Sequence, residues 1–183
     1  MRVITGVARG KRLITVQGND IVRPTGDKVK EALFSSIQFD IEGRRILDLF
    51  AGSGQLGIEA LSRGAESATF VDVNDASIKV IKQNLANTSL EELSTVQKSD
   101  YSTFALRCSQ KFDIAFLDPP YQAGILEDAV SKTIPLMSNY GKIFCEHPLE
   151  LKLPESIDNF SVVKIYRYGK TLVTVYAKDV ADQ

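Results

Sequence analysis

The chain has 183 residues, of which 44% are hydrophobic and 25% are charged, and its formal net charge at pH 7 is −1. These values are typical of one soluble globular domain, and no apolar run approaches the ~20 residues that a membrane-spanning helix needs. The single histidine and two cysteines argue against a zinc site. Cys108 and Cys145 lie in or beside apolar stretches, so we expect buried free thiols and a cytoplasmic protein with no membrane contact.

The charge is unevenly distributed along the chain. Residues 1–30 contain seven Lys or Arg and two Asp, a local charge of +5, which leaves −6 for the remainder (−1 − 5). A basic arm on an acidic body predicts a polyanionic partner for the arm. A solvated charged segment that binds nothing is the alternative.

The first predicted elements form a small extension. Residues 2–5 and 11–16 are strand-like and enclose a basic, glycine-containing loop, which predicts a β-hairpin. Apolar residues at Val29, Ala32, Leu33 and Ile37 fall on one face of a helix predicted over residues 27–39. We therefore divide the chain into an extension, residues 1–42, and a main domain, residues 43–183.

The main domain alternates strands with helices. Strands are predicted at 46–50, 68–71, 94–98, 112–117 and 142–145, and helices at 55–63, 75–86, 101–108 and 125–137. Such alternation predicts a parallel sheet with right-handed crossovers. Residues 160–166 and 171–176 add an antiparallel hairpin. The predicted fold is therefore α/β, Rossmann-like and doubly wound, with a mostly parallel seven-stranded sheet.

A glycine-rich turn follows the first predicted strand. Gly52, Gly54 and Gly57 match G-x-G-x-x-G, a weak signal that lets the backbone approach a ligand at a helix start. Asp72 ends the second strand 20 residues after Gly52, in register for a contact with ribose hydroxyls. The turn and this carboxylate together predict a site for an adenosine-bearing cofactor, with simple capping of the next helix as the alternative for Asp72.

The charge near this turn favours one class of cofactor. Asp48 lies four residues before Gly52 and would repel the pyrophosphate of NAD. S-adenosylmethionine has no phosphate and carries an ammonium and a sulfonium, which suit an acidic site. The sequence also offers no nicotinamide partner, so an NAD enzyme is the weaker alternative.

The most specific signal is the string Asp118-Pro119-Pro120-Tyr121, directly after the strand at 112–117. This position is the carboxyl end of a parallel strand, where open α/β sheets bind ligands. The prolines have no N–H, so a carboxylate and carbonyls remain to accept hydrogen bonds from an amino group. Tyr121 offers a face on which a planar base can stack, worth roughly 1–3 kcal/mol. A proline-rich turn with a buried tyrosine is the alternative.

These strings carry a family resemblance. Residues 48–54, DLFAGSG, resemble motif I of class I S-adenosylmethionine-dependent methyltransferases, and residues 118–121 resemble the D/N-P-P-Y/F motif of those that methylate exocyclic amino groups. Longer strings at 4–6, 9–13, 23–34 and 56–65 are similar to the RsmD-type enzymes that methylate a guanine N2 of 16S rRNA. Asp72 departs from the family's usual Glu, and Gln55 from a smaller residue.

The resemblance implies roles for individual residues. The cofactor would be held by Asp48, Phe50, Ala51, Gly52, Ser53, Gly54, Asp72, Val73, Asp100 and Tyr101. The target base and its amino group would meet Asp118, Pro119, Pro120 and Tyr121. The phosphates of the RNA would be bound by Arg9, Lys11, Arg12, Arg23 and Lys28.

The resemblance also implies a reaction. A methyl group would pass from S-adenosylmethionine to the N2 amino group of a specific guanine in 16S rRNA, within the small ribosomal subunit or its assembly intermediate, leaving S-adenosylhomocysteine. We expect a monomeric enzyme without a metal. A DNA adenine-N6 or protein glutamine-N5 methyltransferase stays open, because the same acceptors fit any planar NH₂ group. A non-catalytic RNA-binding assembly factor is a further alternative.

Overall fold

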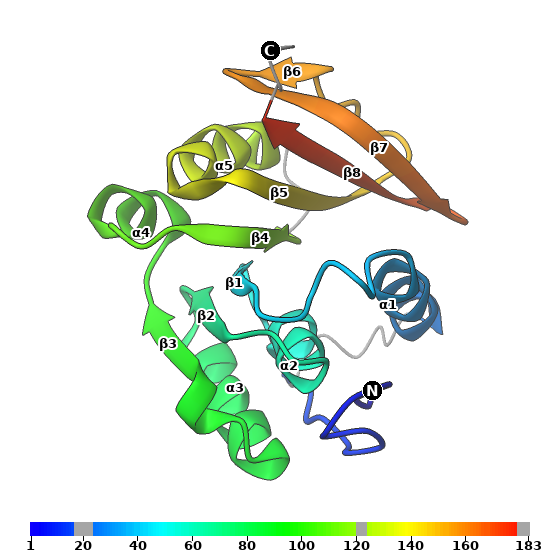
Figure 1. The fold of residues 1–183 in the computed structure, drawn as a ribbon, viewed down its shortest axis with the longest axis vertical. Coiled ribbons are helices and arrows are strands. Elements are labelled where there is room, and N and C mark those ends of the chain that lie inside the picture. Colours follow the sequence, from blue (N-terminus) through cyan, green and yellow to red (C-terminus); the bar gives the residue numbers. More distant parts are fainter. Residues whose placement is uncertain (17–23, 120–123, 179–183) are drawn as a thin grey trace.

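A single eight-stranded sheet runs through the molecule in the order β3-β2-β1-β4-β5-β8-β7-β6 (Figure 1). The computed structural model describes residues 1–16, 24–119 and 124–178, and for residues 24–28 the backbone alone. The strands are β1 Arg45–Leu49, β2 Ser67–Asp72, β3 Ser94–Lys98, β4 Phe112–Leu117, β5 Met137–Pro148, β6 Ser156–Ile157, β7 Phe160–Tyr168 and β8 Thr171–Lys178. Strands β1 to β5 pair in parallel, and β8, β7 and β6 follow β5 in antiparallel pairs.

Helices cover both faces of this sheet. Their bounds are α1 Pro24–Ser36, α2 Gln55–Ser62, α3 Asp75–Thr88, α4 Tyr101–Arg107 and α5 Ile125–Thr133, with short 3₁₀ helices η1 Glu91–Leu93 and η2 Ile134–Leu136. Residues of α1, α2 and α3 belong to one buried cluster and residues of α4 and α5 to another, one on each side of the sheet (Figure 1). Within the described part of the chain, no helix is long and apolar enough to cross a membrane.

The predicted fold class is confirmed, with differences at three elements. The sheet has eight strands rather than seven, because the two-residue β6 pairs with β7 and is too short to produce a sequence pattern. The helix predicted over 125–137 ends at Thr133. Pro135 follows within η2 and has no N–H to continue an α-helix. Strand β5 therefore starts at Met137, earlier than the predicted residue 142.

The first helix joins the core through stacked aromatic rings. The Phe34 ring of α1 lies 5.5 Å from that of Phe116 on β4, and the Phe116 ring lies 5.7 Å from that of Phe144 on β5. All three side chains are buried. The boundary predicted at residue 42 stays a prediction, but the extension and the main domain share this one core cluster.

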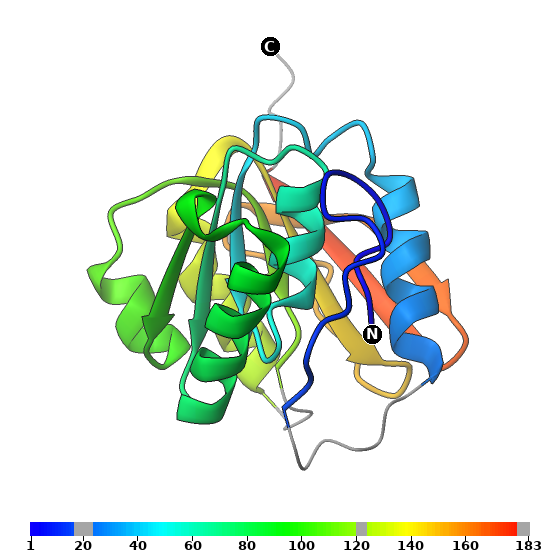
Figure 2. The same ribbon diagram turned by 90° about the horizontal axis from the view of Figure 1, so that it is seen from below.

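Residues 1–16, here called the arm, form a looser structure than the predicted hairpin. A single antiparallel bridge joins Arg2 to Arg12 within the described residues. Val3 N donates to the Lys11 carbonyl at 2.9 Å and Leu13 N to the Met1 carbonyl at 3.1 Å, so the two segments pair as a short antiparallel hairpin. The pairing is limited because the N–H groups of residues 4, 5, 7 and 8 bond to α2 instead. The arm runs along α2 between α1 and α3 (Figure 2). A Cβ on Gly6 would lie 1.6 Å from the Ser62 carbonyl oxygen, so the arm contacts α2 very closely.

The carboxylate of Glu59 on α2 holds the arm in place and is fully buried. Its Oε2 accepts a hydrogen bond from Ile4 N at 2.8 Å, and its Oε1 accepts one from Thr5 N at 3.1 Å. Lys30 Nζ of α1 lies 3.8 Å from Oε2 and donates to the Arg2 carbonyl at 2.7 Å. Glu59 therefore joins the arm, α1 and α2 in one buried polar cluster.

We expect Glu59→Gln to lower the free energy of unfolding by about 3 kcal/mol, the usual cost of breaking a buried ion pair. The amide would remove the charge opposite the buried Lys30 ammonium and direct N–H groups at backbone donors. Urea unfolding measures the change. Glu92→Gln, at an exposed residue of η1, is the matched control and should stay within about 0.5 kcal/mol. Equal losses for the two variants would contradict the role of Glu59.

Candidate cofactor and substrate site

The carboxyl ends of β1, β2 and β4 meet at one edge of the sheet. Leu49 is in register with Val71 on β2 and with Leu117 on β4. The next residues along these strands, Phe50, Asp72 and Asp118, therefore start the three loops side by side. This edge is where open α/β sheets bind their ligands.

The glycine loop is held in a backbone conformation that few side chains adopt. Phe50 has a φ of 65°, and Gly52 and Gly54 have φ values of 55° and 76°. A non-glycine residue in this region costs roughly 1–2 kcal/mol. The Phe50 ring lies 5.3 Å from that of Tyr101, a contact that offsets part of this cost. Gly54 N donates to Ala51 O at 2.7 Å and closes the turn before α2.

Asp72 fixes both the glycine loop and the start of α3. Its Oδ2 accepts from Gly52 N at 2.9 Å, and its Oδ1 accepts from Asn74 N at 2.8 Å. The N-cap of α3 is Asn74, whose side chain accepts from Ala76 N, so Asp72 does not cap this helix. Each carboxylate oxygen has a second acceptor position, which leaves Asp72 able to receive ribose hydroxyls.

Asp48 lies beneath the first turn of α2 and is 3% exposed. Its Oδ2 accepts from Gly57 N at 2.9 Å. Burial raises the pKa of Asp48 to about 8, the Gly57 hydrogen bond opposes this rise, and the charges of Asp118 and Asp72 add to it. The visible contact of Asp48 is thus with the loop and helix, and a contact with the cofactor stays a prediction.

The turn between β3 and α4 lies beside Asp72, because Ser99 N donates to the Asp72 carbonyl at 3.1 Å. Asp100 caps α4 by accepting from Thr103 N at 2.9 Å, and the hydrogen bonds from Thr103 lower the pKa of Asp100. The exposed carboxylate at this turn and the 65% exposed Val73 lie at the carboxyl edge of the sheet, and their contacts with a cofactor stay predictions.

Tyr101 connects this turn to α5. Its hydroxyl donates to Asp128 Oδ2 at 2.7 Å, and Lys132 Nζ lies 5.5 Å from the centre of its ring. Lys132 also forms an ion pair with Asp128. The ring of Tyr101 therefore contacts both Phe50 and Lys132, and its place against the cofactor stays a prediction.

Asp118 and Pro119 follow β4 directly. Asp118 is partly exposed and Pro119 is buried, and the Asp118 charge acts on buried Asp48. Pro120 and Tyr121 lie outside the described residues, so their predicted roles stay predictions. The structure therefore brings the first half of the Asp-Pro-Pro-Tyr string to the edge that carries the glycine loop.

The basic residues of the arm are exposed where they are described. Arg9, Lys11 and Arg12 face solvent. Arg23 lies outside the described residues, and only the backbone of Lys28 is described. A hollow of about 270 Å³ opens between the arm and α1, and its walls are Arg2, Val3, Ile4, Arg9, Gly10 and Glu31.

A buried asparagine joins the arm to the glycine loop, and no sequence pattern predicted it. Asn84 of α3 accepts from Ile14 N at 2.7 Å, and its Nδ2 donates at 2.9 Å to the carbonyls of Ile14 and Ser53. In the sequence, Asn84 is only a polar residue beside the apolar stripe of α3, and nothing there marks it as a contact to the arm. Glu59 was likewise visible only as a charge among apolar helix positions.

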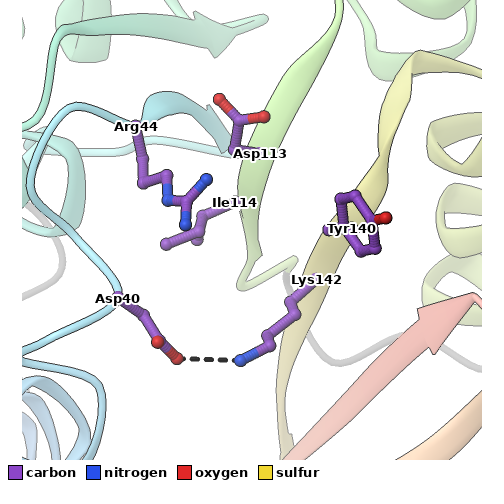
Figure 3. Close-up of a pocket in the computed structure, with 6 residues that line it drawn as sticks. All are labelled: Asp40, Arg44, Asp113, Ile114, Tyr140 and Lys142. Atoms are coloured by element: carbon purple, nitrogen blue, oxygen red, sulfur yellow. Dashed lines mark hydrogen bonds and ion pairs between the residues drawn. The ribbon is translucent and has the colours of Figure 1, made fainter.

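A second hollow, of about 150 Å³, lies at the opposite edge of the sheet (Figure 3). Its walls are Asp40, Arg44, Asp113, Ile114, Tyr140 and Lys142. Lys142 pairs with Asp40 at 2.8 Å, and Arg45 pairs with Asp113 at 3.1 Å. These residues stand at the amino ends of β1 and β4, so this hollow does not adjoin Asp72 or Asp118.

We expect Gly57→Ala to destabilise the chain by about 1–3 kcal/mol, because the space around Gly57 is already filled. The displaced helix start should also weaken cofactor binding. An added Cβ would lie 2.3 Å from Phe70 Cε1 and 3.2 Å from Asp48 Oδ2. Thermal unfolding and calorimetric titration with S-adenosylhomocysteine measure the two effects. Adding Phe70→Leu should recover part of the loss, and strictly additive effects of the two substitutions would contradict this contact.

Comparison with known proteins identifies relatives along the whole chain. A family model described as conserved hypothetical protein 95 matches residues 1–177. Ribosomal RNA small subunit methyltransferase D of Escherichia coli (strain K12) is 33% identical over 98% of this chain and 90% of its own length. The protein of that name from Haemophilus influenzae is 39% identical over 72% of this chain and 69% of its own.

A solved structure shows the same arrangement. The structure of yhhF from Escherichia coli has a TM-score of 0.84 and 32% identity and covers 99% of each chain. A more distant structure, SMU.776 complexed with SAH, has a TM-score of 0.68 at 13% identity over 81% of this chain, a likeness of fold alone. The family resemblance predicted from the motifs is confirmed, and the chain belongs to the family of conserved hypothetical protein 95, the RsmD family.

Proposed function

We propose that this chain transfers a methyl group from S-adenosylmethionine to the N2 amino group of a guanine in the RNA of the small ribosomal subunit. Membership of the family supports methyltransferase activity on that RNA, because its relatives are named small-subunit ribosomal RNA methyltransferases. The observation that carries the proposal is the position of Asp118 and Pro119 beside the glycine loop, at the shared carboxyl ends of β1 and β4.

The cofactor proposal rests on the charges of this edge. Asp72, Asp100 and Asp118 are the charged carboxylates at or near the glycine loop, and they would repel a pyrophosphate, whereas buried Asp48, with its pKa raised to about 8, adds little charge near neutral pH. S-adenosylmethionine fits them, since its ammonium, ribose hydroxyls and adenine amino group are cationic or hydrogen-bond donors. When bound, this cofactor supplies a methyl group on a positively charged sulfur.

The chain's own residues would orient the acceptor. The carboxylate of Asp118 and the carbonyl of Pro119 would accept the two N–H groups of the guanine amino group and turn its nitrogen lone pair toward the methyl group. Positioning of this kind lowers a barrier by several kcal/mol. Asp118 would either take the released proton or only orient the group. The base must leave its stack to reach this edge, and Tyr121 is the proposed stacking partner.

The arm is the proposed contact with RNA. Exposed Arg9, Lys11 and Arg12 would neutralise phosphates, and the hollow lined by Arg2 and Arg9 adjoins them. The arm is bonded to α2, the helix that follows the glycine loop. Phosphate contacts on the arm would therefore be held at a fixed position relative to the cofactor edge. DNA and protein substrates remain outcomes of the tests below.

We expect Asp118→Ala to lower the rate of methyl transfer to undermethylated small subunits by about 10²–10³-fold, because it removes one amino-group acceptor. Affinity for S-adenosylhomocysteine should change less than about threefold, since the loop is intact. Mapping of modified nucleosides in 16S rRNA by mass spectrometry, in a strain lacking the protein and complemented with each variant, locates the nucleotide.

Two further variants sharpen this experiment. Asp40→Ala, at the opposite edge of the sheet, is the control and should complement fully. Asp118→Asn keeps an acceptor but cannot take a proton, so full activity would show that Asp118 only orients the amino group. Unchanged methylation by Asp118→Ala, or transfer to DNA but not to the subunit, would refute the proposed function.

We expect Asp72→Ala to weaken binding of S-adenosylhomocysteine by about 10–100-fold, because it removes a charged acceptor worth roughly 1.5–3 kcal/mol and releases Gly52 N. Calorimetric titration measures this. Asp75→Ala is the matched control, since Asp75 is exposed and pairs with Lys98 on the surface. Binding of NADH without binding of S-adenosylhomocysteine by the wild-type chain would replace the proposed cofactor with the NAD alternative.

A further inference from the structure

A second carboxylate lies next to Asp118 in the sheet. Leu117 on β4 is in register with Cys145 on β5. The following residues, Asp118 and Glu146, therefore occupy neighbouring positions on adjacent parallel strands, whose spacing is about 4.8 Å. Glu146 is partly exposed and lies inside β5, where its backbone pairs with Val173 on β8 and directly follows Cys145, the last residue paired with β4.

Both side chains point to the same face of the sheet. Residues two apart along a strand share a face, and Phe116 and Phe144 belong to the cluster under α1, α2 and α3. Leu117 and Cys145 belong to the cluster on the other face. Glu146 therefore projects toward the α1 side. Asp118, one residue beyond β4, follows the same alternation, and its charge acts on Asp48, which lies on the same face of β1 as Ile46 of the α1-side cluster. Across β8, Val173 opposite Glu146 belongs to the α1-side cluster as well.

The end of β5 is held rigidly beneath Glu146. His147 is 2% exposed, and its Nε2 lies 2.8 Å from the Thr174 hydroxyl of β8 while its Nδ1 lies 3.0 Å from the Pro148 carbonyl. Because a carbonyl only accepts, Nδ1 carries the proton and Nε2 accepts from Thr174. Burial lowers the pKa of His147, which keeps the ring neutral. A side chain held on such a strand can discriminate between ligands by the positions of their hydrogen-bonding atoms.

We propose that Glu146 accepts the N1–H of the target base and so selects guanine over other bases that carry an amino group. This inference rests on the proposed function. If Asp118 and Pro119 hold the N2 amino group, two ring nitrogens flank it, N1–H and the unprotonated N3, and only N1–H can donate to a carboxylate at the neighbouring strand position, that of Glu146. Both carboxylates already take part in interactions within the chain, so the base would exchange partners with them.

The chemistry of the bases gives this position its selectivity. Guanine presents N1–H next to its amino group, which a carboxylate accepts. Adenine and cytosine present an unprotonated ring nitrogen next to theirs, and its lone pair would face the carboxylate charge. A site built to accept an N–H rejects an analogue without it far more strongly than an apolar pocket rejects a missing methylene.

The test compares guanine with 2-aminopurine, which keeps the 2-amino group but has no N1–H. Small subunits are assembled from 16S rRNA that carries either base at the mapped nucleotide, and kcat/KM is measured for both. We expect the wild type to prefer guanine and Glu146→Gln to reduce that preference by about 10–100-fold, the factor for one hydrogen bond to a charged group. The glutamine amide can donate to N1 of 2-aminopurine, so kcat/KM of Glu146→Gln on the 2-aminopurine subunit should equal or exceed that of the wild type.

The outcomes separate this inference from the proposed function. Glu150→Gln, at an exposed residue after β5, should leave both rates and their ratio unchanged. Equal losses of Glu146→Gln on the two bases, or a reduced affinity for S-adenosylhomocysteine that accounts for the loss, would mean a structural role and overturn the inference. Failure of the wild type to methylate guanine would overturn the proposed function itself.

Discussion

The buried Glu59 carboxylate fixes the position of the arm relative to the glycine loop and the carboxyl ends of β1, β2 and β4. A fully buried charge is tolerated only when it is paired and hydrogen-bonded. Here the arm's own N–H groups at Ile4 and Thr5 supply two of those bonds, and Arg63 supplies a third at 2.8 Å. The arm cannot lift from α2 without leaving this charge short of donors. The basic arm, the proposed contact with RNA, is thus packed against the folded core, and its position is set by the helix that begins at the glycine loop.

A second link makes that relation more direct. Asn84 bonds the arm at Ile14 and the glycine loop at Ser53 through one buried amide. Asp72 accepts a hydrogen bond from the backbone N–H of Gly52, the residue before Ser53 in the same loop. The loop that would touch the cofactor is therefore fixed from two sides, by a carboxylate of the sheet and by an amide that also fixes the arm. A change of loop geometry on cofactor binding would reach the arm through Asn84, because a buried amide cannot release a partner cheaply.

Much of the fold could be predicted because apolar periodicity and turn residues are local signals. Strands β3 and β4 have the predicted bounds, and the alternation of strands with helices gave the parallel sheet. Apart from the end of α5, which Pro135 sets locally, what failed depended on contacts between distant residues. The arm was predicted as a hairpin from two strand-like runs, but the pairing is limited to the part near Arg2 and Arg12 because other donors of the arm bond to Glu59 and Ser62, more than fifty positions away. The two-residue β6 exists only because β7 offers an edge to pair with, and no pattern of two residues can show that.

The site divides in the same way. The carboxylates at strand ends were predictable, since the carboxyl edge of a parallel sheet is fixed by topology and Asp72 and Asp118 end their strands. The state of Asp48 was not, because burial raises its pKa to about 8 and only the packing of α2 over β1 determines that burial. Near neutral pH most of the Asp48 population is protonated, so Asp72, Asp100 and Asp118 carry most of the charge at this edge. The acidic character that would disfavour a pyrophosphate therefore comes from residues at or just after strand ends, whose positions the sequence made visible. Glu146 was not visible, because its neighbour in space is 28 positions away (146 − 118) and only strand register brings the two together.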